Sequence, residues 1–357
     1  MANAERMMDS TYSFQSRTTF PLSNASRQKP RRWPLVLRFV KGAIHTAILG
    51  PVLFHALFTV LVVYVDRSVD GDIGLPPSII PSLSIVVGLM LVFRNQTSYE
   101  RFWTGRNYFT QISTCVRNLS RSFLVCYYHA DQPATTSDRA DTEKVVRILI
   151  ALLYAVKDHL RAEWGVGVPS DSSDGDGSIK SEYNDLLPKG LRGYEDYGLG
   201  FPLELVFLVE KYIKKATDRG WFNAPQASQL QAQLNTLVDA YGRMETIRMT
   251  PLPVAHLIHQ KQVLALFCCV LPFAMVGHNT DDMGWWAVPI VMLVTFTLYG
   301  IEGIGSQLED PFGYDKNDIK LDAIVEDSRQ EIMVTLDEWK NGGEMFALDP
   351  QVRFFHS

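Results

Sequence analysis

Residues 79–103 read IIPSLSIVVGLMLVFRNQTSYERFW, an uncharged apolar run that changes to a polar, basic segment at Arg94. Taken alone, Ile79–Phe93 is short for a membrane crossing, because about 20 apolar residues are needed to span the hydrocarbon core. Continued past Arg94, however, the pattern indicates one long helix whose basic part has left the bilayer. The segment therefore predicts a transmembrane helix that extends into water.

Three further apolar runs accompany this one. Ala43–Val65 contains no Asp, Glu, Lys or Arg and is long enough to cross a bilayer by itself. Val263–Gly277 and Trp285–Ile304 are short or interrupted, which is tolerated where neighbouring helices satisfy the freed backbone groups. Soluble enzymes also bury apolar helices, but these runs together favour an integral membrane protein with four transmembrane helices.

Basic residues gather on one side of the four runs. The two short connecting loops, 66–72 and 279–282, hold Arg67 as their one basic residue. Lysines and arginines instead flank the other ends of the runs, at Lys29, Arg31, Arg32, Arg38, Lys41, Arg94, Arg101, Arg106, Arg117, Arg121, Arg243, Arg248 and Lys261. Since positive residues stay on the cytosolic side, we expect a multi-pass protein with both termini cytosolic. The sequence does not name the membrane.

Hydropathy divides the chain into five parts. These are a polar, disordered tail (1–30), transmembrane helices 1 and 2 (31–98), a helical cytosolic domain (99–260), transmembrane helices 3 and 4 (261–305) and a cytosolic C-terminal segment (306–357). The tail lacks the apolar core of a signal peptide, and a mitochondrial transit peptide is a weaker alternative. Residues 165–181 are rich in Gly, Ser and Asp and predict a flexible loop.

The middle region reads as helical, with no strand-rich stretch. Apolar residues recur there at helical spacing. They are Val145, Ile148, Leu149, Leu152 and Leu153 in one stretch, and Leu230, Leu234, Leu237 and Tyr241 in another.

Composition and motifs exclude several classes of function. The 357 residues carry 34 basic and 39 acidic side chains, and a net charge of -5 does not suit a nucleic-acid-binding protein. There is no Walker A loop, nucleophile elbow, HExxH or CxxC pair, so we expect no enzyme. The adjacent Cys268 and Cys269 point about 100° apart on a helix and are read as structural thiols.

Three bulky apolar residues of the second run lie on one helical face. Ile85, Leu89 and Phe93 are spaced by four, and Gly88 between them permits close helix approach. Such a row ordinarily faces lipid or a protein core. If several copies of the chain surrounded an axis, the row would instead form stacked apolar rings and a hydrophobic constriction that opens by wetting.

Three motifs in order resemble the bestrophin family, including its bacterial and fungal branch. They are Phe93–Trp103, Thr250–Pro253 and the segment GIGSQLEDPFGYDKNDIKLD at Gly303–Asp322, and the resemblance covers about Arg32 to Glu331. It implies an all-α pentamer around a central pore, with a helical cytosolic domain containing an inner vestibule. It also implies that Ile85, Leu89 and Phe93 are the three neck positions.

The resemblance leaves ion selectivity open, since eukaryotic members conduct chloride and other small anions whereas bacterial relatives can favour cations. An apolar neck carries no fixed charge and selects weakly by sign, so preference would come from helix N-termini or basic rings elsewhere. Arg94 and Arg101 are candidates at the cytosolic mouth. Their alternative role is anchoring, through headgroups or through carboxylates such as Glu302, Glu309 and Asp310.

Calcium is the one cofactor that the resemblance raises, and none is required. Animal members bind calcium at an acidic cluster after the PFG triplet, and Asp315 and Asp318 match its spacing here. Lys316 and Asn317 interrupt the acidic run, although backbone carbonyls can complete a calcium site of six to eight oxygens. In the alternative, Asp318 caps a helix that starts near Ile319.

The sequence therefore predicts a homopentameric ion channel, most readily one for chloride or other small anions, whose partners are those ions, membrane lipids and copies of itself. A monovalent cation channel of the same fold and a non-conducting membrane scaffold are the alternatives. A lower constriction in the cytosolic domain is expected around Pro225–Leu230.

Overall fold

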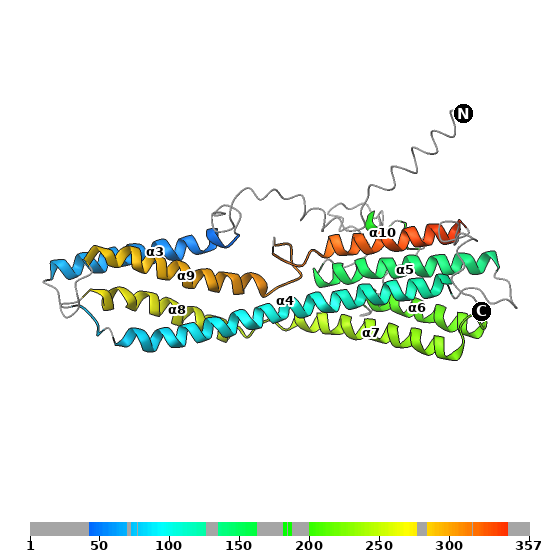
Figure 1. Ribbon diagram of the computed structural model, residues 1–357, viewed down its shortest axis with the longest axis horizontal. Helices are drawn as coiled ribbons and strands as arrows, with labels where there is room; N and C mark the ends of the chain where they lie inside the picture. The colour runs from blue at the N-terminus through cyan, green and yellow to red at the C-terminus, as the bar shows by residue number, and fades with distance from the viewer. Residues whose placement is uncertain are drawn as a thin grey trace, which may run out of the picture. The chain divides into compact units, whose positions relative to one another are not determined.

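The computed structural model describes residues 43–69, 73–76, 78–125, 135–162, 181–183, 185–187, 200–276, 284–315 and 317–341 (Figure 1). This described part contains eight α-helices and no strand, which confirms the predicted all-α class. The tail at 1–30, most of the loop at 165–181 and the end of the C-terminal segment lie outside the described residues.

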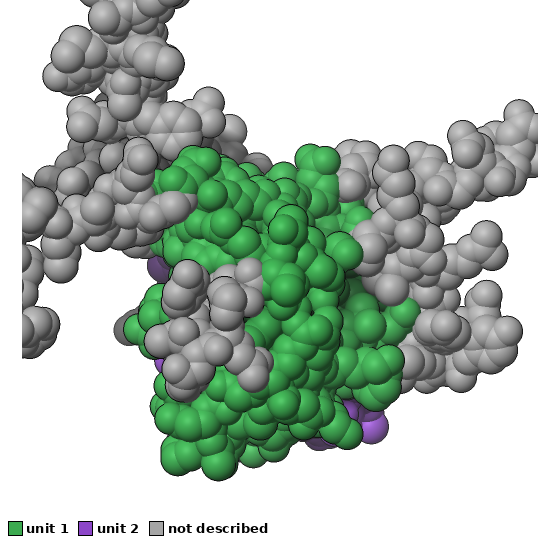
Figure 2. Space-filling model, turned by 90° about the vertical axis from the view of Figure 1, so that its right-hand side faces the viewer, with its two compact units in different colours: residues 1–30, 107–245, 320–357 green, residues 31–106, 246–319 purple. Residues whose placement is uncertain are grey.

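The chain divides into two compact units, coloured separately in Figure 2. Unit 2 comprises residues 31–106 and 246–319, and unit 1 comprises residues 1–30, 107–245 and 320–357. Two helices continue from one unit into the other, namely α4 (Ile79–Val125) and α7 (Ala224–Met249).

Unit 2 holds the apolar helices. In addition to the first part of α4, it contains α3 (Ala43–Ser68), α8 (Val254–Met275), the 3-10 turn η4 (Gly284–Trp286) and α9 (Ala287–Leu308). Among the described residues, α3, α4, α8 and η4 with α9 are long and apolar enough to cross a membrane. Three of these segments contain a whole run predicted from hydropathy, and α8 contains its run up to Met275.

The helices extend further than the runs that predicted them. The second run continues without a break to Val125, as its sequence indicates. The third helix starts at Val254 rather than near Val263, because its first turns carry polar residues that lower the hydropathy without breaking the helix. Its start is set by the segment Thr250–Pro253, where two prolines without an N–H group separate α7 from α8.

Two apolar clusters hold unit 2 together. In the first, Val87 and Leu91 of α4 pack against Leu264, Phe267 and Cys268 of α8. The second joins α3, the end of α8 and the start of α9 through Val62, Val63, Val276 and Ala287. Helices α3 and α9 lie side by side in Figure 1.

A glycine allows this close approach of α3 and α9. A Cβ atom added at Gly303 would lie 2.9 Å from Cγ2 of Ile44, so a larger residue there would push the two helices apart.

Unit 1 is a helical bundle around α5 (Thr136–Leu160). It also contains η2 (Ser181–Tyr183), α6 (Phe201–Asp218), α10 (Leu321–Lys340) and the remaining parts of α4 and α7. Helix α5 is buried on nearly all sides, and the apolar residues that predicted helices in the middle region are all buried. The helical prediction is therefore confirmed for the described part of this region.

Local sequence signals set the ends of some unit 1 helices. Thr135 and Asp138 form a reciprocal capping box at the start of α5, which satisfies backbone N–H groups that the first turn leaves exposed. Helix α10, by contrast, starts at Leu321 with Lys320 at the N-cap position and no side-chain cap. The helix thus starts two residues after Ile319, close to the expected position, but the expected N-cap role of Asp318 is wrong.

Candidate functional site

The apolar part of α4 has two opposite faces. Val87 and Leu91 are buried against α8, whereas Ile85, Leu89 and Phe93 are 70%, 54% and 56% exposed. At 100° per residue, the centre of the exposed row lies roughly 180° from the centre of the buried row. Packing within the chain therefore leaves the predicted neck residues uncovered.

Gly88 adds space beside this exposed row. A Cβ atom added there would meet nothing within 4 Å inside the chain. The described chain thus presents large apolar side chains, with a gap between them, on a membrane-spanning helix. In a membrane such a surface faces either lipid or other copies of the chain, and the neck assignment stays a prediction.

Arg94 follows the exposed row in sequence, but its side chain is buried on the opposite side of α4. Its side chain is 1% exposed, and its Nη2 atom lies 3.5 Å from a carboxylate oxygen of both Glu302 and Glu309. Gly305 makes room for the guanidinium, because an added Cβ would lie 3.3 Å from Nε of Arg94. Two of the three carboxylates proposed from sequence as its partners thus surround Arg94 within unit 2.

Asn95 attaches the same turn of α4 to α9. Its Nδ2 group donates to the backbone carbonyl of Leu91 at 2.9 Å and to that of Ile301 at 3.1 Å. Asn95 is part of the Phe93–Trp103 motif, but the sequence alone does not indicate what its side chain binds. Its function is visible only once α9, about 200 positions further along the chain, lies beside α4.

Arg101 binds the ends of two helices. Its Nε donates to the backbone carbonyl of Glu309, directly after α9, at 3.1 Å. At the end of α7, its Nη1 donates to the backbone carbonyl of Thr250 at 2.7 Å and its Nη2 to that of Ile247 at 2.6 Å. The last carbonyls of a helix have no intrahelical partner, and a cation suits the negative end of the helix dipole. The location of Arg94 and Arg101 at a cytosolic mouth stays a prediction.

The PFG segment folds back against α4. Phe312 is fully buried, and an added Cβ at Gly105 would lie 2.8 Å from its Cζ atom. Asp310, which was expected to pair with Arg94 or Arg101, instead forms an ion pair with Arg248. The motif thus supplies a buried aromatic anchor and an ion pair within unit 2.

Asp318 closes a turn in this segment. Its Oδ2 atom accepts the backbone N–H of Asp315 at 2.7 Å, and the N–H of Ile319 donates to the carbonyl of Pro311 at 3.0 Å. No group of three or more His, Cys, Asp or Glu residues suited to a metal occurs among the described residues. The two aspartates alone do not provide the six to eight oxygens that calcium prefers, so calcium binding at Asp315 and Asp318 stays a prediction.

A charged cluster around the buried Lys157 stabilises unit 1. The Nζ atom of Lys157 lies 2.9 Å from Glu182, 3.4 Å from Asp158 and 3.4 Å from Asp322. Burial by itself lowers the pKa of Lys157, but the surrounding carboxylates raise it overall. The Arg161 guanidinium, bound to Asp322 by two 2.8 Å hydrogen bonds, lowers the pKa of that carboxyl to about 2, against a smaller opposing effect of burial. The cluster joins α5, η2 and α10.

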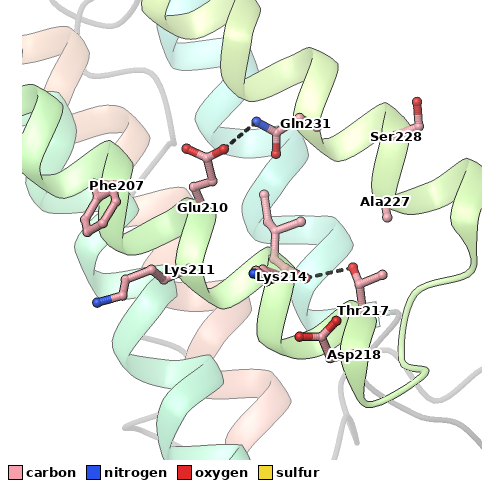
Figure 3. A pocket seen from close by; sticks show the side chains of 10 residues that line it. Phe207, Glu210, Lys211, Lys214, Thr217, Asp218, Ala227, Ser228 and Gln231 are labelled. Atoms are coloured by element: carbon pink, nitrogen blue, oxygen red, sulfur yellow. Dashed lines mark hydrogen bonds between the residues drawn. The ribbon is translucent and has the colours of Figure 1, made fainter.

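An open groove lies on the surface of α6 and α7 (Figure 3). It has a volume of about 630 Å³ and includes Lys211, Lys214 and a 2.9 Å hydrogen bond from Gln231 to Glu210. All of its charged side chains are exposed, so it offers no enclosed binding site. The predicted lower constriction at Pro225–Leu230 forms the first turns of α7 beside this groove, and its role stays a prediction.

Four long apolar helices and an attached helical bundle define an integral membrane protein. The family model of the Bacterial/Fungal Bestrophin protein matches residues 24–334, and the chain therefore belongs to the bestrophin family. The resemblance seen in the three motifs is confirmed.

Individual relatives and solved structures agree with this family. A voltage-dependent anion channel-forming protein of a Nostoc species is 36% identical over 325 residues, which cover 90% of this chain and 94% of that protein. One of a Synechocystis species is 34% identical over 321 residues, covering 89% and 96%. A crystal structure of a bacterial bestrophin homolog from Klebsiella pneumoniae matches with a TM-score of 0.67 and 21% identity, over 82% of this chain and 99% of that one, and it supports the fold.

Proposed function

We propose that this chain is the subunit of an oligomeric anion channel whose neck is lined by Ile85, Leu89 and Phe93. The observation that carries the proposal is the uncovered apolar row on α4, opposite the face that packs within the chain. Relatives named as anion channel-forming proteins support conduction of anions, and chloride is the small anion we expect.

In this proposal several copies, and five by analogy with the family, gather their α4 helices around one axis. Each of the three residues then forms an apolar ring, and an ion passes after losing part of its hydration shell. Such rings control conduction by wetting and contribute little selection by sign. No bond is made or broken, so the protein is proposed as a conduit and not as an enzyme.

A matched pair of triple variants tests the neck. In proteoliposomes, Ile85→Ala with Leu89→Ala and Phe93→Ala should raise the chloride flux roughly tenfold, which corresponds to a barrier lowered by about 1.4 kcal/mol. The control removes three equally exposed leucines from α3, and its flux should equal that of the wild type. The control substitutions are Leu49→Ala, Leu57→Ala and Leu61→Ala.

The outcomes separate the proposal from its rivals. Equal flux through the neck variant and the wild type would refute the neck. A reversal potential that follows the potassium gradient instead of the chloride gradient would identify a cation channel. Wild-type protein without ion flux under any gradient would identify a membrane scaffold, and a monomer in mild detergent would remove the shared axis.

A further inference from the structure

A cavity of about 500 Å³ opens among α3, α8 and α9, within unit 2. Its volume falls in the range of about 300–1,000 Å³ that is usual for small-molecule sites. One part of its wall is apolar and comes mainly from α3, through Ile44, Ile48 and Pro51. Another part is polar and includes Lys261 of α8 and Glu302 of α9. The cavity is therefore amphipathic.

The cavity lies at one end of the membrane-spanning segments. Ile44 stands at the start of α3, Lys261 about two turns after the start of α8, and Glu302 about two turns before the end of α9. Because α8 and α9 run in opposite directions, these positions meet at the same depth. A lysine there keeps its charge in the interface while its stem lies along apolar surface, which is where lipid headgroups are found.

The charges around the cavity are balanced. Lys261 lies 3.6 Å from Glu302, and Arg94 lies 3.5 Å from both Glu302 and Glu309, so two cations face two carboxylates. Glu302 is only 9% exposed, and its Oε1 atom has no hydrogen-bond partner among the described residues. Its ion pairs are longer than the 2.7–2.9 Å of a charged hydrogen bond. The site thus holds a buried carboxylate that lacks a close donor.

Lys261, in contrast, remains accessible. Its side chain is 59% exposed although it is paired with Glu302, so its ammonium can still donate to a ligand. A purely anionic ligand would find a local charge sum of zero and no net attraction. A ligand that presents an acceptor to Lys261 and a donor to Glu302 satisfies both groups.

We propose that this cavity binds a glycerophospholipid with a primary ammonium headgroup, namely phosphatidylethanolamine. Its phosphate accepts hydrogen bonds from Lys261, and its ammonium donates to the Glu302 carboxylate. One acyl chain lies along Ile44, Ile48 and Pro51. Phosphatidylcholine carries the same charges, but its trimethylammonium has no hydrogen to donate, and the anionic headgroup of phosphatidylglycerol has no cation for Glu302.

Native mass spectrometry of the delipidated protein tests this site. Phosphatidylethanolamine, phosphatidylcholine and phosphatidylglycerol with identical acyl chains are added one at a time at equal concentration. The wild type should retain phosphatidylethanolamine about tenfold more than either other lipid, the effect of one charged hydrogen bond. Equal retention of phosphatidylcholine, or stronger retention of phosphatidylglycerol, would overturn the proposal.

A pair of lysine variants localises the effect. Lys261→Met should lower phosphatidylethanolamine retention to the level of phosphatidylcholine, whereas Lys211→Met, which removes an exposed lysine of unit 1, should not. Retention unchanged by Lys261→Met would place the lipid elsewhere. The wild-type ranking of headgroups needs no variant and stands even if Lys261→Met folds poorly.

Soluble phosphoethanolamine distinguishes a lipid from its headgroup alone. At the same concentration as the lipid, phosphoethanolamine should displace no bound lipid, because it lacks the acyl chain that packs against α3. Efficient displacement would identify a soluble ligand and contradict the lipid assignment. Binding is measured without ion flux, so the result does not depend on whether the protein conducts.

Discussion

Replacing Arg101 tests whether this side chain is part of an ion pathway or a structural clasp, meaning a side chain that holds the ends of α7 and α9 together through hydrogen bonds. Its guanidinium donates three hydrogen bonds, at 2.6, 2.7 and 3.1 Å, to carbonyls at the ends of α7 and α9. Hydrogen bonds from charged groups contribute about 1.5–3 kcal/mol each. Since Arg101 is half-buried, we take about 1 kcal/mol for each bond after screening by solvent.

Arg101→Met should therefore destabilise the protein by about 3 kcal/mol, because three carbonyls lose their donor while the aliphatic stem is retained. At about 2 °C per kcal/mol for a long chain, the unfolding midpoint should fall by about 6 °C. Arg101→Lys keeps the charge but not the planar fork, so it should lose roughly half as much. Arg121→Met removes an exposed arginine from the same helix and serves as the control, with no shift.

The assay is thermal unfolding of the purified protein in detergent, followed by tryptophan fluorescence, together with reversal potentials under asymmetric chloride. A clasp lowers the unfolding midpoint and leaves the reversal potential unchanged. An unchanged midpoint with a shifted reversal potential would refute the clasp and place Arg101 in the ion pathway.

Three further predictions follow from single contacts. Gly105→Ala should lower stability by about 1–3 kcal/mol, as measured by thermal unfolding, because the new Cβ would lie 2.8 Å from the buried ring of Phe312. Asp322→Asn should cost about 1 kcal/mol at pH 7, after discounting for the exposure of the carboxylate that Arg161 binds. Asp318→Ala should abolish any response of channel current to a calcium titration.

The pH dependence of the Asp322 effect has a definite sign. Its pKa is lowered from 3.8 to about 2, so the folded protein binds a proton less readily than the unfolded chain. The stabilisation is complete above the unfolded pKa near 4 and is lost as pH falls towards 2. The difference in unfolding midpoint between wild type and Asp322→Asn should therefore shrink between pH 5 and pH 3. A difference that grows in that range would contradict the assignment.

Two controls complete these tests. Gly300→Ala adds a Cβ with nothing within 4 Å, so it should leave stability unchanged or raise it, unlike Gly105→Ala. If wild-type current already ignores calcium, the calcium role of Asp318 is wrong, and closing the turn with Asp315 remains its observed structural role.

The family and the membrane helices follow from sequence because their signals are local and one-dimensional. A run such as Ala43–Val65 is uncharged whatever surrounds it, and transfer of apolar side chains from water depends on their type and number. The period of Val145, Ile148 and Leu149 likewise predicts a helix with one buried face before any partner is known. The order of the three motifs along the chain, beginning with Phe93–Trp103, then indicates the family.

The tertiary structure alone decided what individual polar side chains bind. Asn95, Arg101 and Lys261 are as hydrophilic as many solvated residues, and nothing nearby in sequence indicates which groups they contact. Their partners, such as the carbonyls of Ile301 and Glu309, come within hydrogen-bond distance only when distant helices pack together. Hydropathy is additive along the chain and can be summed from the sequence, whereas a hydrogen bond requires two groups within about 3 Å, which only the folded chain determines.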